Sequence, residues 1–305
     1  MMNKKKIFLA ILLLSAITIS SGVFFWPKAK PIITATPEKN LIDEPIEIVI
    51  SHLKPHEQVI IEASCKDKDN NAWLSRATFQ ADDKGIVNVA KQAPTSGSYN
   101  GIDPMGLFWS MTPTIKNQTL SMLISLNLTP FELSVFSGNK LLTQETMYRP
   151  YIAPNIEKKE IREQGVVGTL FYPKGKRCPG VMAIPGSSGQ LPNYVSQLLA
   201  SHGYAVFELR YFGVEGLPKN LSLIPLEYFK NAMQWLKKQP QVDDSKIALI
   251  GQSTGGDLAL LLASTFPGEM NAVIALSAPS FVFGSWTYKN NQIPSVSLSH
   301  KEMLK

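Results

Sequence analysis

The stretch that decides how the second half of the chain folds is Ile247-Ala248-Leu249-Ile250-Gly251-Gln252-Ser253-Thr254-Gly255-Gly256-Asp257-Leu258-Ala259-Leu260. Its first four residues are apolar and predict a buried strand, whereas its last four open an apolar helical run. Between the two stands a G-x-S-x-G pattern centred on Ser253. A serine on a sharp turn between strand and helix is the arrangement of a nucleophile elbow. The pattern therefore predicts that Ser253 stands exposed on this turn as a catalytic nucleophile.

Two backbone amides are expected to stabilise the negative charge that such a reaction develops. One is the N–H of Thr254, the residue after the nucleophile, and the other comes from a loop after an earlier strand. The apolar run 180–184 leads into the small-residue loop 185–189, in which Ser187 or Ser188 is the expected donor. An ordinary strand-to-helix turn explains this loop equally well, so both interpretations stay open here.

Strand-like and helix-like segments alternate on both sides of the elbow. The predicted strands are 166–172, 180–184, 205–209, 246–250 and 272–277, and the predicted helices are 193–202, 225–238 and 257–266. This alternation is typical of βαβ units and a parallel sheet, so an α/β domain is expected over residues 155–305.

The first half of the chain has a β pattern instead. Short apolar or alternating runs recur at 46–50, 59–63, 73–79, 86–90, 120–126 and 131–136, with turn-forming clusters between them. About seven such strands predict an immunoglobulin-like β-sandwich over residues 31–150.

Residues 1–30 have the order of a signal or anchor segment. Three lysines lie within the first six residues, and residues 7–26 carry no charge. Such a run is long enough to cross a bilayer, and the preceding positive charges place the following domains outside the cytoplasm. We therefore expect export, with the segment either cleaved or kept as a single N-terminal membrane anchor. A misassigned start codon before a cytoplasmic protein is the alternative.

Composition excludes several other classes of protein. The 305 residues are 44% apolar and 18% charged, which excludes extensive disorder. The net charge of +6 comes largely from five lysines in residues 1–30, without which 25 basic and 24 acidic residues nearly balance, so no nucleic-acid partner is expected. Cys65 and Cys178 are predicted to be buried free thiols. Neither a metal site nor a cofactor is expected, because no cluster has ligand spacing.

The chain resembles the acyl-CoA thioesterase and bile-acid-CoA:amino acid N-acyltransferase family over about residues 33–298. The segments that carry the resemblance are Thr34-Ala35-Thr36-Pro37, Leu41-Ile42-Asp43-Glu44-Pro45, Asp103-Pro104-Met105-Gly106-Leu107-Phe108-Trp109-Ser110, Leu226-Glu227-Tyr228-Phe229, the elbow, and Asn291-Gln292-Ile293-Pro294. The resemblance implies an immunoglobulin-like domain before an α/β-hydrolase domain that cleaves acyl-CoA thioesters.

A serine at the elbow favours hydrolysis of the thioester over transfer of the acyl group to an amino acid. The acyltransferases of this family are known for cysteine at the elbow, and its hydrolases for serine. An acyl-cysteine is a thioester that an amine attacks readily, whereas an acyl-serine is better suited to activated water. Ser253 therefore predicts an acyl-CoA thioester hydrolase.

The other two members of a catalytic triad are not found. In this fold the order is serine, acid, histidine, with the last two after later strands. Only one strand is predicted after Ser253, so the chain is expected to be C-terminally truncated, with the last strands missing. His52 and His56 lie in the predicted sandwich, His202 is expected to cap a helix, and His300 precedes any further strand. This truncated form is expected to be weakly active or inactive.

Two other functions stay open at this stage. An exported esterase on the same fold, acting on non-CoA acyl esters, fits the leader. A non-catalytic, degenerate member that acts as a binding protein fits the missing triad.

Overall fold

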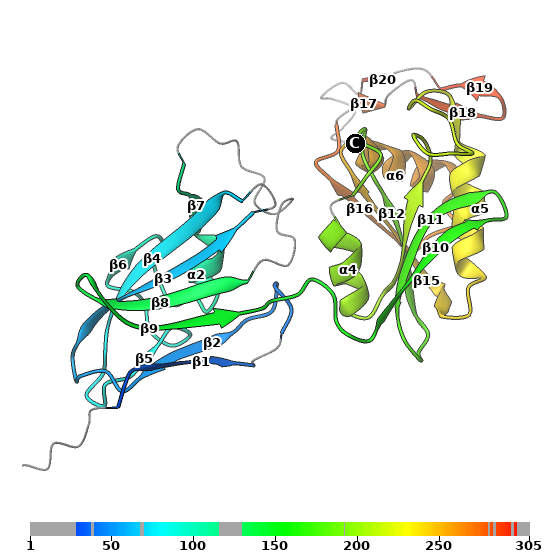
Figure 1. The fold of residues 1–305 in the computed structure, drawn as a ribbon. Helices are drawn as coiled ribbons and strands as arrows, with labels where there is room; N and C mark the ends of the chain where they lie inside the picture. The colour runs from blue at the N-terminus through cyan, green and yellow to red at the C-terminus, as the bar shows by residue number, and fades with distance from the viewer. Residues whose placement is uncertain are drawn as a thin grey trace, which may run out of the picture.

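The computed structural model describes residues 29–37, 40–67, 70–115, 130–191, 193–279, 281–282, 285–293 and 296–297. The predicted signal or anchor segment, up to residue 28, and the predicted strand 120–126 lie outside the described residues. Within the described ranges, β-sheets of the first half and a helix-flanked sheet of the second half are joined by a short connection (Figure 1).

The first half is a sandwich of antiparallel strands, as predicted. One sheet has the order β1-β2-β5, and the other has the order β6-β4-β3-β8-β9, with β7 paired to β4. Their bounds are β1 Ile32–Thr36, β2 Glu47–Ser51, β3 Gln58–Lys66, β4 Ala72–Gln80, β5 Val87–Asn88, β6 Ser96–Gly97, β7 Thr112–Pro113, β8 Phe131–Ser137 and β9 Lys140–Met147. Alternate residues of β3 and β4 are buried, because successive side chains of a strand point to opposite faces.

The segment of residues 103–110, one of those that carry the resemblance, packs on this sandwich through the buried Leu107 and Phe108. It forms the short helix α2, Gly106–Trp109. Before this helix, the Asp103 carboxylate accepts hydrogen bonds from the Met105 amide at 2.8 Å and from the Trp109 indole at 2.7 Å. A Cβ at Gly106 would lie 2.2 Å from the Tyr99 ring, so only glycine fits there. The motif is therefore a packing requirement of the first domain.

The second half contains a mixed sheet with the order β10-β11-β13-β12-β15-β16. Its elements are β10 Ile156–Glu163, β11 Val166–Pro173, β12 Cys178–Ile184, α4 Asn193–Ser201, β13 Ala205–Arg210, α5 Leu226–Lys237, β15 Val242–Gln252, α6 Thr254–Thr265 and β16 Ala272–Leu276. The pairs from β13 through β16 are parallel, as predicted, whereas β10, β11 and β13 pair antiparallel. The sheet is therefore parallel from β13 to β16, as in the predicted α/β hydrolase, and antiparallel at its β10–β11 edge. β10 was not predicted from the sequence, because its many charged residues resemble a surface loop.

Helices cover both faces of this sheet. α5 and α6 pack in one cluster with Phe207 and Leu249, and α4 packs on the opposite face with Val206 and Ala183. Short strands outside the main sheet form two small sheets, β14-β18-β19 and β17-β20. β14 Ile224–Pro225 precedes α5, and the others follow β16: β17 Phe281–Val282, β18 Trp286–Tyr288, β19 Asn291–Gln292 and β20 Val296–Ser297. The architecture is that of an α/β hydrolase preceded by a β-rich domain.

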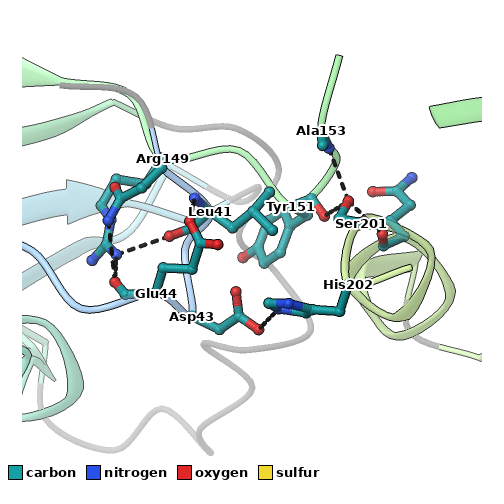
Figure 2. Close-up of polar contacts among 10 residues, drawn as sticks. Leu41, Asp43, Glu44, Arg149, Tyr151, Ala153, Ser201 and His202 are labelled. Atoms are coloured by element: carbon teal, nitrogen blue, oxygen red, sulfur yellow. Dashed lines mark hydrogen bonds and ion pairs between the residues drawn. The ribbon is translucent and has the colours of Figure 1, made fainter. Parts of the chain in front are cut away.

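Polar contacts tie the two halves together (Figure 2). His202 Nε2, just after α4, lies 2.8 Å from Asp43 Oδ2 of the sandwich. Ser201 Oγ accepts a bond from the Ala153 amide at 2.8 Å. Helix α4 ends as predicted, with Gly203 at a positive φ of 98° and the His202 amide bonded to the Leu198 carbonyl. The imidazole itself reaches the other domain, a contact that the capping interpretation did not include.

Both cysteines are buried and free, which confirms the prediction. Cys65 faces the sulfur of Met111 at 3.7 Å, and burial raises the pKa of its thiol to about 11. Burial also raises the pKa of the Cys178 thiol. Neither thiol is therefore a candidate nucleophile, because the thiolate is the reactive form.

Arg149 lies at the end of the sandwich, 3% exposed, and its guanidinium stacks 4.7 Å from the Phe108 ring centroid. Its Nη2 donates to the carbonyls of Leu41 (2.9 Å) and Glu44, and so ties the chain before β2 to the exit of the domain. Desolvation lowers the pKa of Arg149 to about 10.

We expect Arg149→Met to destabilise the protein by about 2–4 kcal/mol, because two buried carbonyls lose their charged donor. The matched control is Arg76→Met, since Arg76 is exposed and pairs only with Glu62, a contact worth about 0–1 kcal/mol. Urea unfolding followed by tryptophan fluorescence measures both. Equal midpoints for the two variants would contradict the role assigned to Arg149.

Candidate active site

The chain between β15 and α6 makes a tight, strained turn at Ser253. Its backbone has φ 55° and ψ −124°, a combination that residues other than glycine rarely adopt. Its amide donates to the Leu276 carbonyl of β16 at 2.8 Å, and its carbonyl accepts the Gly256 amide at 2.8 Å. Ser253 is exposed, whereas residues 254–259 behind it are buried. The turn thus presents the serine hydroxyl to solvent at the carboxyl end of the sheet.

The two glycines of the motif permit the close crossing of strand and helix. A Cβ at Gly251 would lie 2.0 Å from the Gly255 carbonyl oxygen. A Cβ at Gly255 would lie 2.5 Å from the carbonyl oxygens of both Ile184 and Pro185. These contacts are with backbone atoms, which cannot rotate away, so the spacing of the motif is set by sterics.

The loop predicted to supply the second oxyanion donor lies beside Ser253. A Cβ at Gly186 would lie 3.1 Å from the Ser253 Cβ and 3.7 Å from its Oγ. From Gly186 the chain makes a four-residue turn, closed by a bond of 3.0 Å from the Gly189 amide to the Gly186 carbonyl. That bond uses neither of the two central amides, Ser187 and Ser188.

Thr254 is the first residue of α6, so its amide has no acceptor within the helix. The positive end of the helix dipole points to the same place. The structure therefore brings Ser253, Thr254 and the turn that carries Ser187 together. The roles of Thr254 and Ser187 as donors stay predictions.

Tyr211 stabilises the loop beside Ser253 by a hydrogen bond and by packing of its ring. Its hydroxyl donates to the Pro185 carbonyl at 2.7 Å, and its ring packs against Phe229 and Trp286. Burial raises the pKa of Tyr211, so it stays a neutral donor.

Tyr211 was not predicted from the sequence as part of the site, and neither were Glu208 and Arg210 of β13. The available signal was a glutamate within the otherwise apolar run of residues 205–209, where a buried charge needs a partner.

The described histidines lie away from Ser253. His202 contacts Asp43, His56 lies 3.2 Å from Asp83 in an exposed turn, and His52 belongs to the sandwich. His300 lies outside the described residues. Asp257 is buried in the first turn of α6, although an acidic residue in a helix usually lies on a polar, exposed face. Among the residues that the structure describes, no group of three or more His, Cys, Asp or Glu side chains could hold a metal ion.

Comparisons with known proteins identify the family. A family model described as the acyl-CoA thioester hydrolase/BAAT N-terminal region matches residues 43–163, and one for the C-terminal region matches residues 224–305. The chain belongs to the acyl-CoA thioester hydrolase/BAAT family.

Relatives in this family are similar over most of the chain. It is 33% identical over 294 residues to the mitochondrial acyl-coenzyme A thioesterase 2 of Mus musculus, covering 93% of this chain and 64% of that protein. It is 35% identical over 245 residues to acyl-coenzyme A thioesterase 6 of Mus musculus, covering 77% and 58%. The chain thus spans about three fifths of the length of the curated relatives it matches.

Solved α/β-hydrolase structures resemble part of the chain. The thioesterase domain from the curacin biosynthetic pathway is 23% identical, with a TM-score of 0.33, over 42% of this chain and 46% of that chain. The deep-sea α/β hydrolase MGS-M1 is 25% identical, with a TM-score of 0.33, over 40% and 56%. The family assignment does not rest on these structures.

The expectation that the domains lie outside the cytoplasm was wrong. The relatives are named as acyl-coenzyme A thioesterases, and the acyl-coenzyme A thioesterases 2 of Mus musculus and Homo sapiens are named as mitochondrial. No helix in the described ranges has the length and apolar character needed to cross a bilayer. The physical reason for the error is that lysines before an apolar run do not identify a compartment, because basic leaders also direct proteins to organelles.

We expect Gly251→Ala to prevent formation of the elbow, because the added methyl group meets the Gly255 backbone. Overpacking of this kind costs roughly 1–3 kcal/mol or more. Gly268→Ala is the matched control, since a Cβ there meets nothing within 4 Å. Thermal unfolding measures the difference, and a Gly251→Ala protein as stable as the Gly268→Ala protein would contradict the steric account.

Proposed function

We propose that this protein hydrolyses acyl-CoA thioesters with Ser253 as the nucleophile, in the second of two domains that span residues 31–150 and 155–305. The observation that carries the proposal is the exposed Ser253 on a strained turn at the N-terminus of α6. Backbone strain concentrates at functional sites, and no feature of packing requires an exposed serine there. The choice of acyl-CoA thioesters as substrates rests on membership of the acyl-CoA thioester hydrolase/BAAT family.

The proposed chemistry follows from this arrangement. Ser253 Oγ attacks the thioester carbonyl and gives its proton to a base, and the carbonyl oxygen becomes an oxyanion. The amides of Thr254 and Ser187 stabilise this oxyanion. The CoA thiolate then leaves, and it takes up the proton from the base. Water attacks the acyl-serine, which releases the fatty acid and restores Ser253.

The base is the part of this machinery that the described residues do not contain. No described histidine lies beside Ser253, and His202 and His56 contact carboxylates elsewhere. Loss of one triad member typically lowers the turnover rate by about four to six orders of magnitude. With only the described residues around Ser253, turnover is therefore expected to be slow.

The first test is hydrolysis of a long-chain acyl-CoA, followed by release of the free thiol. We expect slow turnover by the protein and none by Ser253→Ala, with Ser264→Ala, an exposed serine near the end of α6, as the control. A Ser253→Ala variant as active as the parent protein would contradict the proposal.

A short-chain nitrophenyl ester serves as the competing substrate. Preference for this ester over acyl-CoA would point to an esterase on the same fold and would contradict the proposed substrate class. Complete absence of Ser253-dependent turnover on both substrates would favour a non-catalytic binding protein.

A further inference from the structure

The turn beside Ser253, residues 186–189, is fixed at its two ends by different means. At its start, Gly186 packs directly on Gln252 and Ser253. At its end, Gly189 packs near the Phe212 ring, and its carbonyl accepts a bond from Arg210 Nη1. Ser187 and Ser188, between the two ends, are exposed. The direction of the Ser187 amide therefore depends on how firmly both ends are held.

Arg210 is the last residue of β13, and its guanidinium is shared between two acceptors. One nitrogen donates to Gly189, and the other, Nη2, lies 3.2 Å from Glu208 Oε1. A planar guanidinium presents several donors in a fixed geometry, so one arginine can bridge a carboxylate and a carbonyl. The main-chain carbonyl of Arg210 accepts the Tyr228 hydroxyl, which fixes the backbone from the opposite side.

Glu208 is unusual because it is a carboxylate, 4% exposed, inside the sheet. Burial raises the pKa of Glu208, and the Arg210 charge opposes that shift. Its second oxygen accepts a bond from Ser196 Oγ of α4 at 3.2 Å. A buried ion pair is weak evidence for stability, since a well-packed apolar pair often does as well. A role beyond stability is a better explanation for keeping the pair in this strand.

We propose that Arg210 is a positioning residue for the oxyanion hole: it holds the Gly189 carbonyl so that the Ser187 amide faces the reacting carbonyl above Ser253. Glu208, anchored by Ser196, holds Arg210 in the orientation that reaches Gly189. Part of this proposal rests on the proposed function, because the oxyanion belongs to that reaction. The ordering of the turn by Arg210 does not rest on it.

Arg210 also lines a cleft, so the experiment must distinguish a contact with substrate there from the positioning of the turn. Together with Gln190 and Lys158 it lines a cleft of about 680 Å³ on the α4 face of the sheet. A direct contact between Arg210 and substrate in this cleft would act on KM. Alignment of the oxyanion donor acts on the transition state and therefore on kcat.

The first measurement is amide hydrogen exchange, which needs no turnover. We expect the peptide that covers residues 185–190 to exchange about 10- to 100-fold faster in Arg210→Met, because a charged hydrogen bond is lost. Arg162→Met is the matched control, since Arg162 Nη1 also donates to a loop carbonyl, that of Glu215, at 2.8 Å. Peptides of β15, in the centre of the same sheet, report on the stability of this domain and should be unchanged.

Two further variants keep the test decisive. Arg210→Lys keeps the charge but cannot bridge both acceptors, so exchange should stay close to that of Arg210→Met. Glu208→Gln should also speed exchange of residues 185–190, and it serves if Arg210→Met does not fold. Exchange at the parent rate in all three variants would overturn the proposal.

Turnover of acyl-CoA supplies the second measurement. We expect kcat to fall about 10- to 100-fold in Arg210→Met with KM unchanged, as for loss of part of an oxyanion hole. A rise in KM at unchanged kcat would assign Arg210 to substrate binding and overturn the positioning role. If the parent protein shows no Ser253-dependent turnover, the proposed function fails, whereas the exchange result still decides whether Arg210 orders the turn.

Discussion

The strained backbone at Ser253 constrains the rest of the second domain. For the chain to leave β15 and enter α6 at once, Gly251 and Gly255 must touch, and Gly255 must lie against the end of β12. The same crossing brings the loop after β12 next to the serine through Gly186. The turn therefore exposes one hydroxyl, aims a helix N-terminus at it and places a second strand-end loop beside it. Substitution of either glycine of the motif would disturb all three features together.

Two arginines, Arg149 and the partly exposed Arg210, hold the less regular parts of the molecule. Arg149 ties the loop before β2 to the exit of the sandwich and stacks on Phe108 of α2. Arg210 ties the turn at residues 186–189 to β13. In both places the guanidinium satisfies main-chain carbonyls in irregular segments, which have no partner strand to do so. Side chains thus provide order where secondary structure does not.

Much of this fold could be predicted from the sequence, because periodicity and glycine spacing report on local sterics. The strands and helices of the second half, the elbow and the sandwich follow from such patterns. β10 was missed because it is an edge strand whose exposed side chains carry charge. Arg210, Glu208 and Tyr211 were missed because their roles depend on contacts between segments far apart in the chain. The compartment was predicted wrongly because basic residues also occur in leaders that direct proteins to organelles, so they do not identify an exported protein.

Covalent labelling is the measurement that decides whether Ser253 is a nucleophile. The folded protein would be treated with a fluorophosphonate and digested, and the modified peptide would be sequenced by mass spectrometry, with heat-unfolded protein as the control. We expect a single phosphonyl adduct on Ser253 in the folded protein and none after unfolding. Absence of the adduct, or an adduct on another serine at an equal rate, would rule out Ser253 as the nucleophile.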